Sequence, residues 1–207
     1  MRANNNNLER ARKALYFQIE KIKDEEIKQF VCSGLSNAPH EFWICPASSS
    51  GKYHPCENLG LSGLIRHTIK CVAVSEEFCD FMNFSEIDRD IVIAASILHD
   101  IKKGGEPWGE HTHPEHPRIA ADYLAKFELR EPEKTEIINC VRYHYGNCTR
   151  TECDKTRAKN LKPNEMAVHL ADVIASRPEI SWLPTYKVPE EKINSFFDDY
   201  LNNFDWG

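Results

Sequence analysis

The sequence predicts an all-α protein folded as a single helical bundle of about seven or eight helices. Apolar residues recur at steps of three and four along most of the chain, which is typical of amphipathic helices. No segment alternates apolar and polar residues long enough to indicate a strand, and there is no internal repeat. The length of 207 residues, 41% of them apolar, is sufficient for one buried core.

The N-terminal part of the chain predicts one helix and a long ordered loop. We expect the helix to continue to about Val31 and to end before Gly34. Segment 36–60 holds three prolines, a Ser-Ser-Ser-Gly stretch and three aromatic residues, so it is interpreted as an ordered loop. The apolar positions that define the helix are Leu8, Ala11, Leu15, Ile19 and Ile22.

The middle of the chain predicts the helices of the core. Residues 61–81 have helical apolar spacing. Ser85, followed three residues later by Asp88, is typical of a helix start. The segment from Ile87 to Leu98 is almost continuously apolar, so we expect that helix to be central and buried.

The C-terminal half alternates loops and helices. Segment 102–114 is rich in Gly, Pro and His and is predicted to be a loop. Segment 149–162 is polar, with five basic and two acidic residues, and is interpreted as an irregular, solvated loop. Helices are expected at 117–127, 132–146, 163–178 and 189–204, the last one acidic.

These elements predict one structural domain with three parts. Residues 1–58 are expected to form a helix and an ordered loop that pack on the core. Residues 59–178 are expected to form the core itself, and residues 179–207 a C-terminal acidic helix.

The formal charge of −6, from 26 Lys and Arg against 32 Asp and Glu, argues against a protein that holds long nucleic acid through bulk charge. No stretch approaches the length of about 18 apolar residues that a membrane helix needs, and the polar N-terminus lacks the apolar core of a signal peptide. We therefore expect a cytoplasmic protein with no membrane partner and with mostly reduced cysteines. Homo-oligomerisation is left open.

Histidines and aspartates form the informative pattern of the sequence. His99 and Asp100 end the most apolar helix, where a polar pair is costly without partners. Imidazole and carboxylate groups are good ligands for divalent first-row metals. Other candidates lie on separate predicted helices, which a bundle can bring together: His67, His116, His144 and Asp172.

The order of these residues, H, HD, H, H, D, resembles the HD-domain metal-dependent phosphohydrolases. The resemblance covers about Leu59 to Arg177 and is closest to the nuclease-like branch that includes bacterial 3′-to-5′ exoribonucleases, with which the chain shares Pro46-Ala47-Ser48 and Tyr53-His54. The segments that carry it are Gly63–Thr68 (GLIRHT), Ile97–Lys103 (ILHDIKK), His116–Ala121 (HPRIAA), Arg142–His144 (RYH) and Leu170–Asp172 (LAD).

The resemblance implies a helical bundle around a site for one or two divalent metal ions. In two-metal members of the family the motif aspartate, here Asp100, bridges the ions. The resemblance implies that the first ion is held by His67, His99, Asp100 and Asp172, and a second one by the additional ligands His116 and His144. The ion itself is left open among Mn, Fe, Ni, Co, Zn and Mg.

In the chemistry that this implies, a hydroxide held by the metals and Asp100 attacks phosphorus in line. The remaining candidate catalytic and substrate-binding residues are chosen by their charge or their aromatic rings. Lys103, Arg66, Arg118 and Arg142 are candidates to balance transition-state charge. His111 and His113 are candidates to protonate the leaving oxygen, and the aromatic side chains of Tyr143 and Trp108 are candidates to stack on a base.

The predicted function is metal-dependent hydrolysis of a phosphoester in a nucleotide or a short single-stranded nucleic acid. Two alternatives stay open at this point. One is a single-metal nucleotidase or deoxynucleoside triphosphate triphosphohydrolase. The other, from a different class, is a binding or regulatory module in which the metal only holds helices together.

Overall fold

The computed structural model describes residues 2–146 and 152–180, and within them all regular secondary structure is helical. The predicted all-α class is confirmed, with nine α-helices in the described residues where seven or eight were expected. The expected acidic helix at 189–204 lies outside the described residues. The elements are α1 (Arg2–Ile19), α2 (Glu25–Ser36), α3 (His40–Ile44), the 3-10 helix η1 (Cys56–Asn58), α4 (Gly63–Phe81), α5 (Glu86–Leu98), α6 (His116–Leu124), α7 (Glu133–Tyr143), α8 (Glu152–Ala158) and α9 (Pro163–Ala175).

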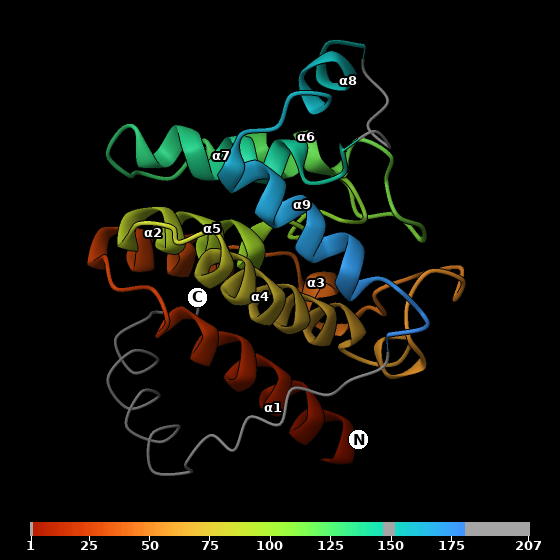
Figure 1. The fold of residues 1–207 in the computed structure, drawn as a ribbon. Helices are drawn as coiled ribbons and strands as arrows, with labels where there is room; N and C mark the ends of the chain where they lie inside the picture. Colours follow the sequence, from red (N-terminus) through yellow and green to blue (C-terminus); the bar gives the residue numbers. More distant parts are fainter. Residues whose placement is uncertain (1, 147–151, 181–207) are drawn as a thin grey trace.

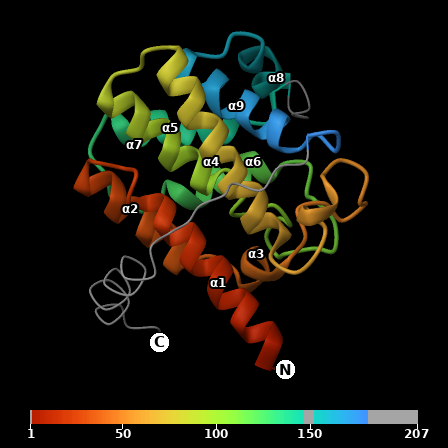
Figure 2. The same ribbon diagram turned by 60° about the horizontal axis from the view of Figure 1, so that its bottom comes forward.

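Helices α4, α5, α7 and α9 form the centre of the bundle. α4 packs against α5 and α9, and α7 packs against α5, α6 and α9. α1 crosses one side of the bundle, where it contacts α4 and α5, and it lies at the edge of the molecule in both ribbon views (Figures 1 and 2). One continuous apolar core joins these helices.

α5 is the central helix that its apolar run predicts. The hydroxyl of Ser85 caps its N-terminus by accepting a hydrogen bond from the backbone N–H of Asp88 at 3.2 Å. All residues from Ile91 to Leu98 are buried. The two residues that follow the helix, His99 and Asp100, therefore lie in the interior and are buried.

The single N-terminal helix expected to reach Val31 is wrong, because the chain breaks between α1 and α2. The buried carboxylate of Asp90 accepts hydrogen bonds from the backbone N–H groups of Lys23, at 3.0 Å, and Asp24, at 2.8 Å. Asp24 in turn caps α2 by accepting from the N–H of Ile27 at 3.0 Å. Hydrogen bonds to α5, a helix distant in the sequence, thus end α1 and allow α2 to begin as a separate helix.

Segment 36–60 contains two short helices, α3 and η1, which the sequence does not predict. It is fastened to α4 by hydrogen bonds: Leu64 N–H donates to the Cys45 carbonyl at 3.1 Å, and the Arg66 guanidinium to the Glu57 carbonyl at 2.6 Å. At Gly63 a Cβ atom would lie 1.9 Å from the Asn58 oxygen, so only glycine fits this contact.

The interpretation of 149–162 as irregular throughout is also wrong, because residues 152–158 form α8. This short helix projects from the bundle (Figure 1). Arg157 connects it to the start of α9 through Glu165 and the Asn160 carbonyl, each at 2.5 Å. The end of the helix is therefore held by an ion pair with the helix that follows it, and no apolar stripe predicts it.

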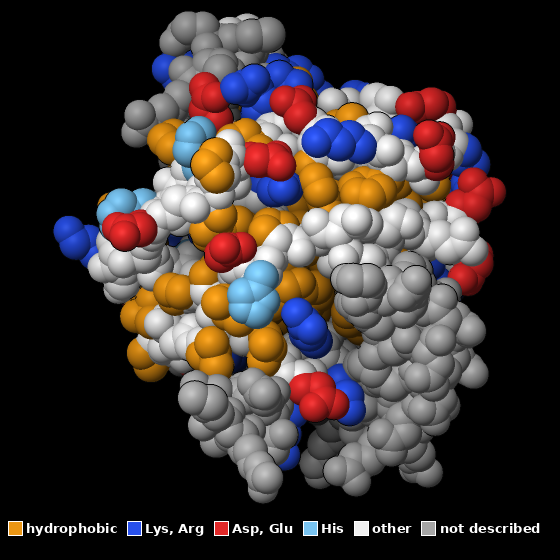
Figure 3. Space-filling view, turned by 180° about the vertical axis from the view of Figure 1, so that it is seen from behind, with side chains coloured by type: hydrophobic (Ala, Val, Ile, Leu, Met, Phe, Trp, Pro, Cys, Tyr) orange, Lys and Arg blue, Asp and Glu red, His pale blue; other side chains and the backbone are white. Residues whose placement is uncertain are grey.

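The surface agrees with the modest net charge. On the face shown in Figure 3, acidic and basic side chains are interspersed among apolar ones and form no broad basic surface. Among the described residues no helix is long and apolar enough to span a membrane. The division into 1–58, 59–178 and 179–207 stays a prediction.

Candidate metal centre

The six predicted ligands meet at one place in the interior. Each comes from the position that its helix dictates. His67 lies within α4 and Asp172 within α9, whereas His99 and His144 are the residues at which α5 and α7 end. His116 is the first residue of α6, and Asp100 follows His99.

One group of ligand atoms is formed by two imidazoles and two carboxylates. His67 Nε2 lies 3.3 Å from His99 Nε2 and 3.1 Å from Asp172 Oδ1. Asp100 Oδ2 lies 3.4 Å from His99 Nε2. Both histidine side chains are fully buried. These atoms converge as the ligands of one cation do.

The second group lies on the other side of the Asp100 carboxylate. His116 Nε2 is 3.1 Å from Asp100 Oδ1 and 3.2 Å from His144 Nε2. His144 Nε2 lies 3.8 Å from the same oxygen. Asp100 therefore presents Oδ2 to one group and Oδ1 to the other, as a residue that bridges two ions would.

Backbone hydrogen bonds fix the orientation of three imidazoles. His99 Nδ1 faces the Ser96 carbonyl at 2.8 Å, and His144 Nδ1 faces the Val141 carbonyl at 2.6 Å. His116 Nδ1 faces the His113 carbonyl at 2.8 Å. Because a carbonyl only accepts, the proton of each neutral ring is on Nδ1, and the lone pair is on Nε2.

The residues fit divalent cations. With the ring protons on Nδ1, the lone pairs of His116 and His144 face each other across 3.2 Å, which is unfavourable without a positive charge between them. The buried Oδ1 of Asp100 accepts no hydrogen bond from the described residues, although burial of an unsatisfied carboxylate oxygen is costly. A cation in contact with these atoms satisfies all three.

The electrostatics point the same way. Burial raises the pKa of the Asp100 carboxyl, but Lys103 and His99 outweigh it and hold that pKa well below its usual range. Burial lowers the pKa of His99, but Asp100 raises it well above the usual value. The pKa of His144 is lowered to about 3 by burial and by His99 and His116. Asp100 is thus charged and His144 neutral at neutral pH, as ligands must be. The carboxylate of Asp100 favours a positive charge on His99, and a bound cation would replace that proton.

The ligands open into a cavity of about 610 Å³, which is within the size range of small-molecule sites. Both candidate metal groups reach it. Its walls come from the segment around Ser48, the loop after α5, and the C-terminal end of α9. The lining residues are Ala47, Ser48, Ser49, Ser50, Tyr53, His54, Asp100, Lys103, His111, Thr112, His116, His144, Tyr145, His169, Asp172, Val173, Ser176, Arg177 and Pro178.

The predicted catalytic side chains occupy different places. Lys103 lines the cavity and holds Asp100 Oδ2 through Nζ at 2.5 Å. His111 lines the cavity and is exposed. His113 does not line the cavity. Its Nδ1 accepts a hydrogen bond from the N–H of Glu115 at 3.2 Å, and its carbonyl faces His116 Nδ1.

None of the five predicted substrate-binding residues lines the cavity. Arg66 donates to the Glu57 and Leu61 carbonyls, and Arg118 pairs with Glu115 at 2.5 Å. Arg142 lies in the last turn of α7, next to Tyr143, whose ring is covered by the Arg157 guanidinium at 5.0 Å. Trp108 lines a small neighbouring hollow of about 40 Å³ together with Lys103 and His111.

Several residues of the cavity wall lie outside the predicted set of site residues. Arg177 is exposed at the rim, two residues after α9. His54 is buried, and its ring packs edge-on against His67 at 4.7 Å between centroids. His169 faces the His144 carbonyl through Nδ1 at 2.6 Å. The signal for Arg177 and His169 was their position within five residues of Asp172.

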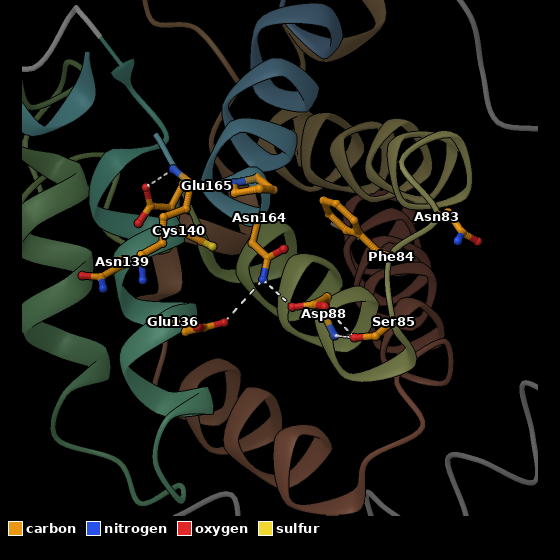
Figure 4. A pocket seen from close by; sticks show the side chains of 11 residues that line it. Asn83, Phe84, Ser85, Asp88, Glu136, Asn139, Cys140, Asn164 and Glu165 are labelled. Atoms are coloured by element: carbon orange, nitrogen blue, oxygen red, sulfur yellow. Dashed lines mark hydrogen bonds between the residues drawn. The ribbon is translucent and has the colours of Figure 1, made fainter. Parts of the chain in front are cut away.

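A second cavity, of about 350 Å³, lies where α7 meets the N-terminal ends of α5 and α9 (Figure 4). Asn164 points between two carboxylates there, at 2.9 Å from Asp88 Oδ1 and 3.4 Å from Glu136 Oε2. No candidate metal ligand lines this cavity. Its polar contacts join three helices and are separate from the ligand cluster.

A comparison with protein families matches residues 64–177 to the HD domain, which is more than half of the 207 residues. The chain belongs to the HD domain family. The match contains all six candidate ligands, from His67 near its start to Asp172 near its end. The predicted superfamily of HD-domain metal-dependent phosphohydrolases is confirmed, and its helical bundle agrees with the structure.

One curated protein provides a further comparison. The chain is 29% identical over 179 residues to the dihydroneopterin 2′,3′-cyclic phosphate phosphodiesterase of Methanocaldococcus jannaschii, in an alignment that covers 76% of this chain and 66% of that protein. The HD domain chain thus spans slightly less than two thirds of the relative's length. No solved structure shows a significant match. The family and this relative together support a hydrolase that acts on phosphoester bonds.

Proposed function

We propose that this HD domain protein is a phosphodiesterase for a substrate of nucleotide size, either a nucleotide or the end of a short single-stranded nucleic acid. The observation that carries the proposal is the shared cavity. Asp100, ligands of both candidate metal groups, and the ammonium of Lys103 all face one space of about 610 Å³. That volume suits one nucleotide-sized ligand.

Bound ions and the side chains of the protein would contribute different parts of the chemistry. Divalent ions held by His67, His99, Asp100, His116, His144 and Asp172 would lower the pKa of water and neutralise charge on the phosphoryl oxygens. Asp100 and Asp172 supply the negative charge that holds the ions. The Nδ1 hydrogen bonds of three histidines keep the ligand nitrogens directed at the ions without reorganisation.

Two basic side chains of the cavity would bind an anionic substrate. Lys103 lies in the cavity wall beside Asp100 and would stabilise the charge that develops in the transition state. Arg177 lies at the rim and is exposed, so it would contact a more distant part of the substrate. His111, exposed on the same wall, would protonate the leaving oxygen.

The comparison suggests where to begin with substrates. The Methanocaldococcus protein is named for a 2′,3′-cyclic phosphate, which is a phosphodiester within a small molecule. We propose cyclic phosphodiesters, including nucleoside 2′,3′-cyclic phosphates, as the first compounds to test on this chain. Linear nucleotides and short single-stranded oligonucleotides form the second set.

The test is a product analysis with the purified protein and each of Mn²⁺, Fe²⁺, Ni²⁺, Co²⁺, Zn²⁺ and Mg²⁺ supplied separately. We expect a phosphomonoester from a cyclic or linear phosphodiester. Asp100→Ala is expected to lower turnover by about 100-fold or more, whereas Asp122→Ala, an exposed aspartate on α6, serves as the matched control. A metal-loaded protein that cleaves no phosphodiester, or an Asp100→Ala variant as active as wild type, would contradict the proposal.

The products also separate the alternatives. Inorganic phosphate and a nucleoside would indicate a nucleotidase, and triphosphate release would indicate a triphosphohydrolase. Shortened oligonucleotides would indicate a nuclease. Each of these products would identify a substrate other than a cyclic phosphodiester, and each is compatible with the same candidate metal centre.

A further inference from the structure

Cys71 lies beside the first group of candidate ligands although the ligand motif does not include it. It follows His67 by four residues, so α4 places both side chains on the same face. The thiol is buried, and Sγ lies 3.4 Å from His67 Nε2. That nitrogen is the one that faces His99 and Asp172.

The four groups form one cluster. Ligand atoms from His67, Cys71, His99 and Asp172 all lie within 4.8 Å of one another. A tetrahedral ion with bonds of about 2.0–2.1 Å to nitrogen and about 2.3 Å to sulfur separates its ligand atoms by roughly 3.3–3.6 Å. The distances from His67 Nε2, of 3.1 Å to Asp172, 3.3 Å to His99 and 3.4 Å to Cys71, are close to that spacing.

We propose that Cys71 supplies a sulfur ligand to the ion held by His67, His99, Asp172 and the bridging Asp100. This inference rests on the metal centre of the proposed function and adds a ligand to it. Loss of the thiol proton on binding gives the ion a thiolate, and soft thiolate ligands favour Zn²⁺, Fe²⁺ and Co²⁺ over Mg²⁺ and Mn²⁺. The first subsite should therefore discriminate against the hard ions.

The position of other cysteines shows that Cys71 is placed differently. Cys79 lies two turns further along α4, is also buried, and belongs to the apolar core. Cys140 is buried in the same core on α7. Cys71 is absent from that apolar cluster and contacts imidazole nitrogen.

Two measurements on full-length protein test the sulfur ligand. Loaded with Co²⁺ at stoichiometric amounts, the wild type is expected to show sulfur-to-cobalt charge-transfer absorption in the near ultraviolet. Loaded with Zn²⁺, its X-ray absorption is expected to contain a sulfur shell at about 2.3 Å beside nitrogen and oxygen at about 2.0–2.2 Å. Neither readout needs turnover.

The variants assign the signal. Cys71→Ser is expected to remove the charge-transfer band and to shift the preference of the first subsite away from Zn²⁺ by at least about tenfold in Kd relative to Mg²⁺. Cys79→Ser, the matched control on the same helix, is expected to retain both. Circular dichroism establishes that each variant is folded.

The outcomes are distinct from those of the proposed function. Stoichiometric binding of Co²⁺ and Zn²⁺ by the wild type without any sulfur signal overturns the role of Cys71 and leaves the His and Asp centre intact. A band that survives in folded Cys71→Ser overturns it as well. If the wild type binds no divalent ion at all, the metal centre itself fails.

Discussion

Asp100 is the residue on which the two groups of candidate ligands converge. Its two oxygens face different histidines, at 3.4 Å from His99 and 3.1 Å from His116. Asp172 approaches only the first group, through His67 at 3.1 Å and His99 at 3.9 Å. Single substitutions can therefore separate the two subsites.

We predict that His144→Ala lowers the bound metal from about two ions per chain to about one, because the second subsite then retains only His116 and Asp100. Metal content after gel filtration, measured by mass spectrometry, checks this. His111→Ala, which removes an exposed cavity histidine outside the ligand set, should leave the content unchanged. About one ion per chain in both the wild type and His144→Ala would indicate a single-metal enzyme, and two ions in both would show that His144 is not needed to hold the second ion.

Lys103 offers a prediction on rate without loss of the ions. Its ammonium lies 2.5 Å from Asp100 Oδ2 and faces the cavity. We expect Lys103→Ala to lower kcat by about 100-fold, as removal of one preorganised donor to transition-state charge does elsewhere. The assay is run at saturating metal with metal content verified, and Lys126→Ala on the exposed surface is the control. A change in KM alone would place Lys103 in substrate binding instead.

At the level of the elements, helices are predictable where one face is apolar and less so where distant residues decide. Ser85 and the apolar run to Leu98 predict α5 within two residues of its observed limits. The break after α1 depends on Asp90, which lies more than 60 positions away in the sequence. The spacing of three and four stops at Ile22 and resumes from Ile27 after a single step of five, which is too small an irregularity to predict two helices.

The candidate site also has a part that the sequence predicts and a part that it does not. The convergence of the six candidate ligands is predictable from the motif order, because the bundle brings together the helix ends and helix centres on which they lie. The residues around the substrate are not, because loop paths place Arg177 at the cavity and turn Arg118 toward Glu115. The position of Cys71, one helical turn after His67, is visible in the sequence. It points to a ligand only after His67 has been placed in the candidate metal centre.

We predict that Asp90→Ala lowers the free energy of unfolding by about 2–4 kcal/mol, because two backbone N–H groups at the junction of α1 and α2 lose their acceptor. Urea unfolding followed by circular dichroism measures it. The matched control is Glu86→Ala, on the same helix, which removes an exposed ion pair with the same Lys23 and should cost at most about 1 kcal/mol. Equal effects of the two variants would contradict the role of Asp90.

The cap of α2 gives a prediction on pH. Hydrogen bonds from Arg130 lower the pKa of Asp24 below its ordinary value, so the ionised side chain favours the folded state. This stabilisation is present above the unfolded pKa of about 3.9 and is lost as the pH falls through the lower folded pKa. Asp24→Asn keeps a cap of similar strength and removes the charge.

We therefore expect Asp24→Asn to be less stable than the wild type by up to about 1 kcal/mol at neutral pH, with a difference that shrinks toward zero as the pH falls through the lowered pKa of Asp24 in the folded state. Urea titrations of both proteins across acidic pH measure this difference. A difference that is independent of pH would show that the Arg130 pair is not its cause.

On the scale of the whole molecule, the ligand cluster joins five helices that the apolar core already holds together. His67 belongs to α4 and Asp172 to α9, while the other ligands come from the ends of α5 and α7 and the start of α6. The core packs the same helices through apolar side chains. The bundle should therefore form without metal, and the ions should add stability rather than create the fold.

This distinction separates an enzyme from a module that metal only holds together. We predict that chelation leaves the helical circular dichroism unchanged and lowers Tm, while hydrolysis is lost. Ions at 100 times their Kd stabilise the folded state by about 2.7 kcal/mol, which corresponds to roughly 5–10 °C for a chain of this size. Asp100→Ala should show no such increase when metal is added. Loss of helicity on chelation would contradict the prediction, because it would mean that the ions, and not the apolar core, hold α4, α5, α7 and α9 together.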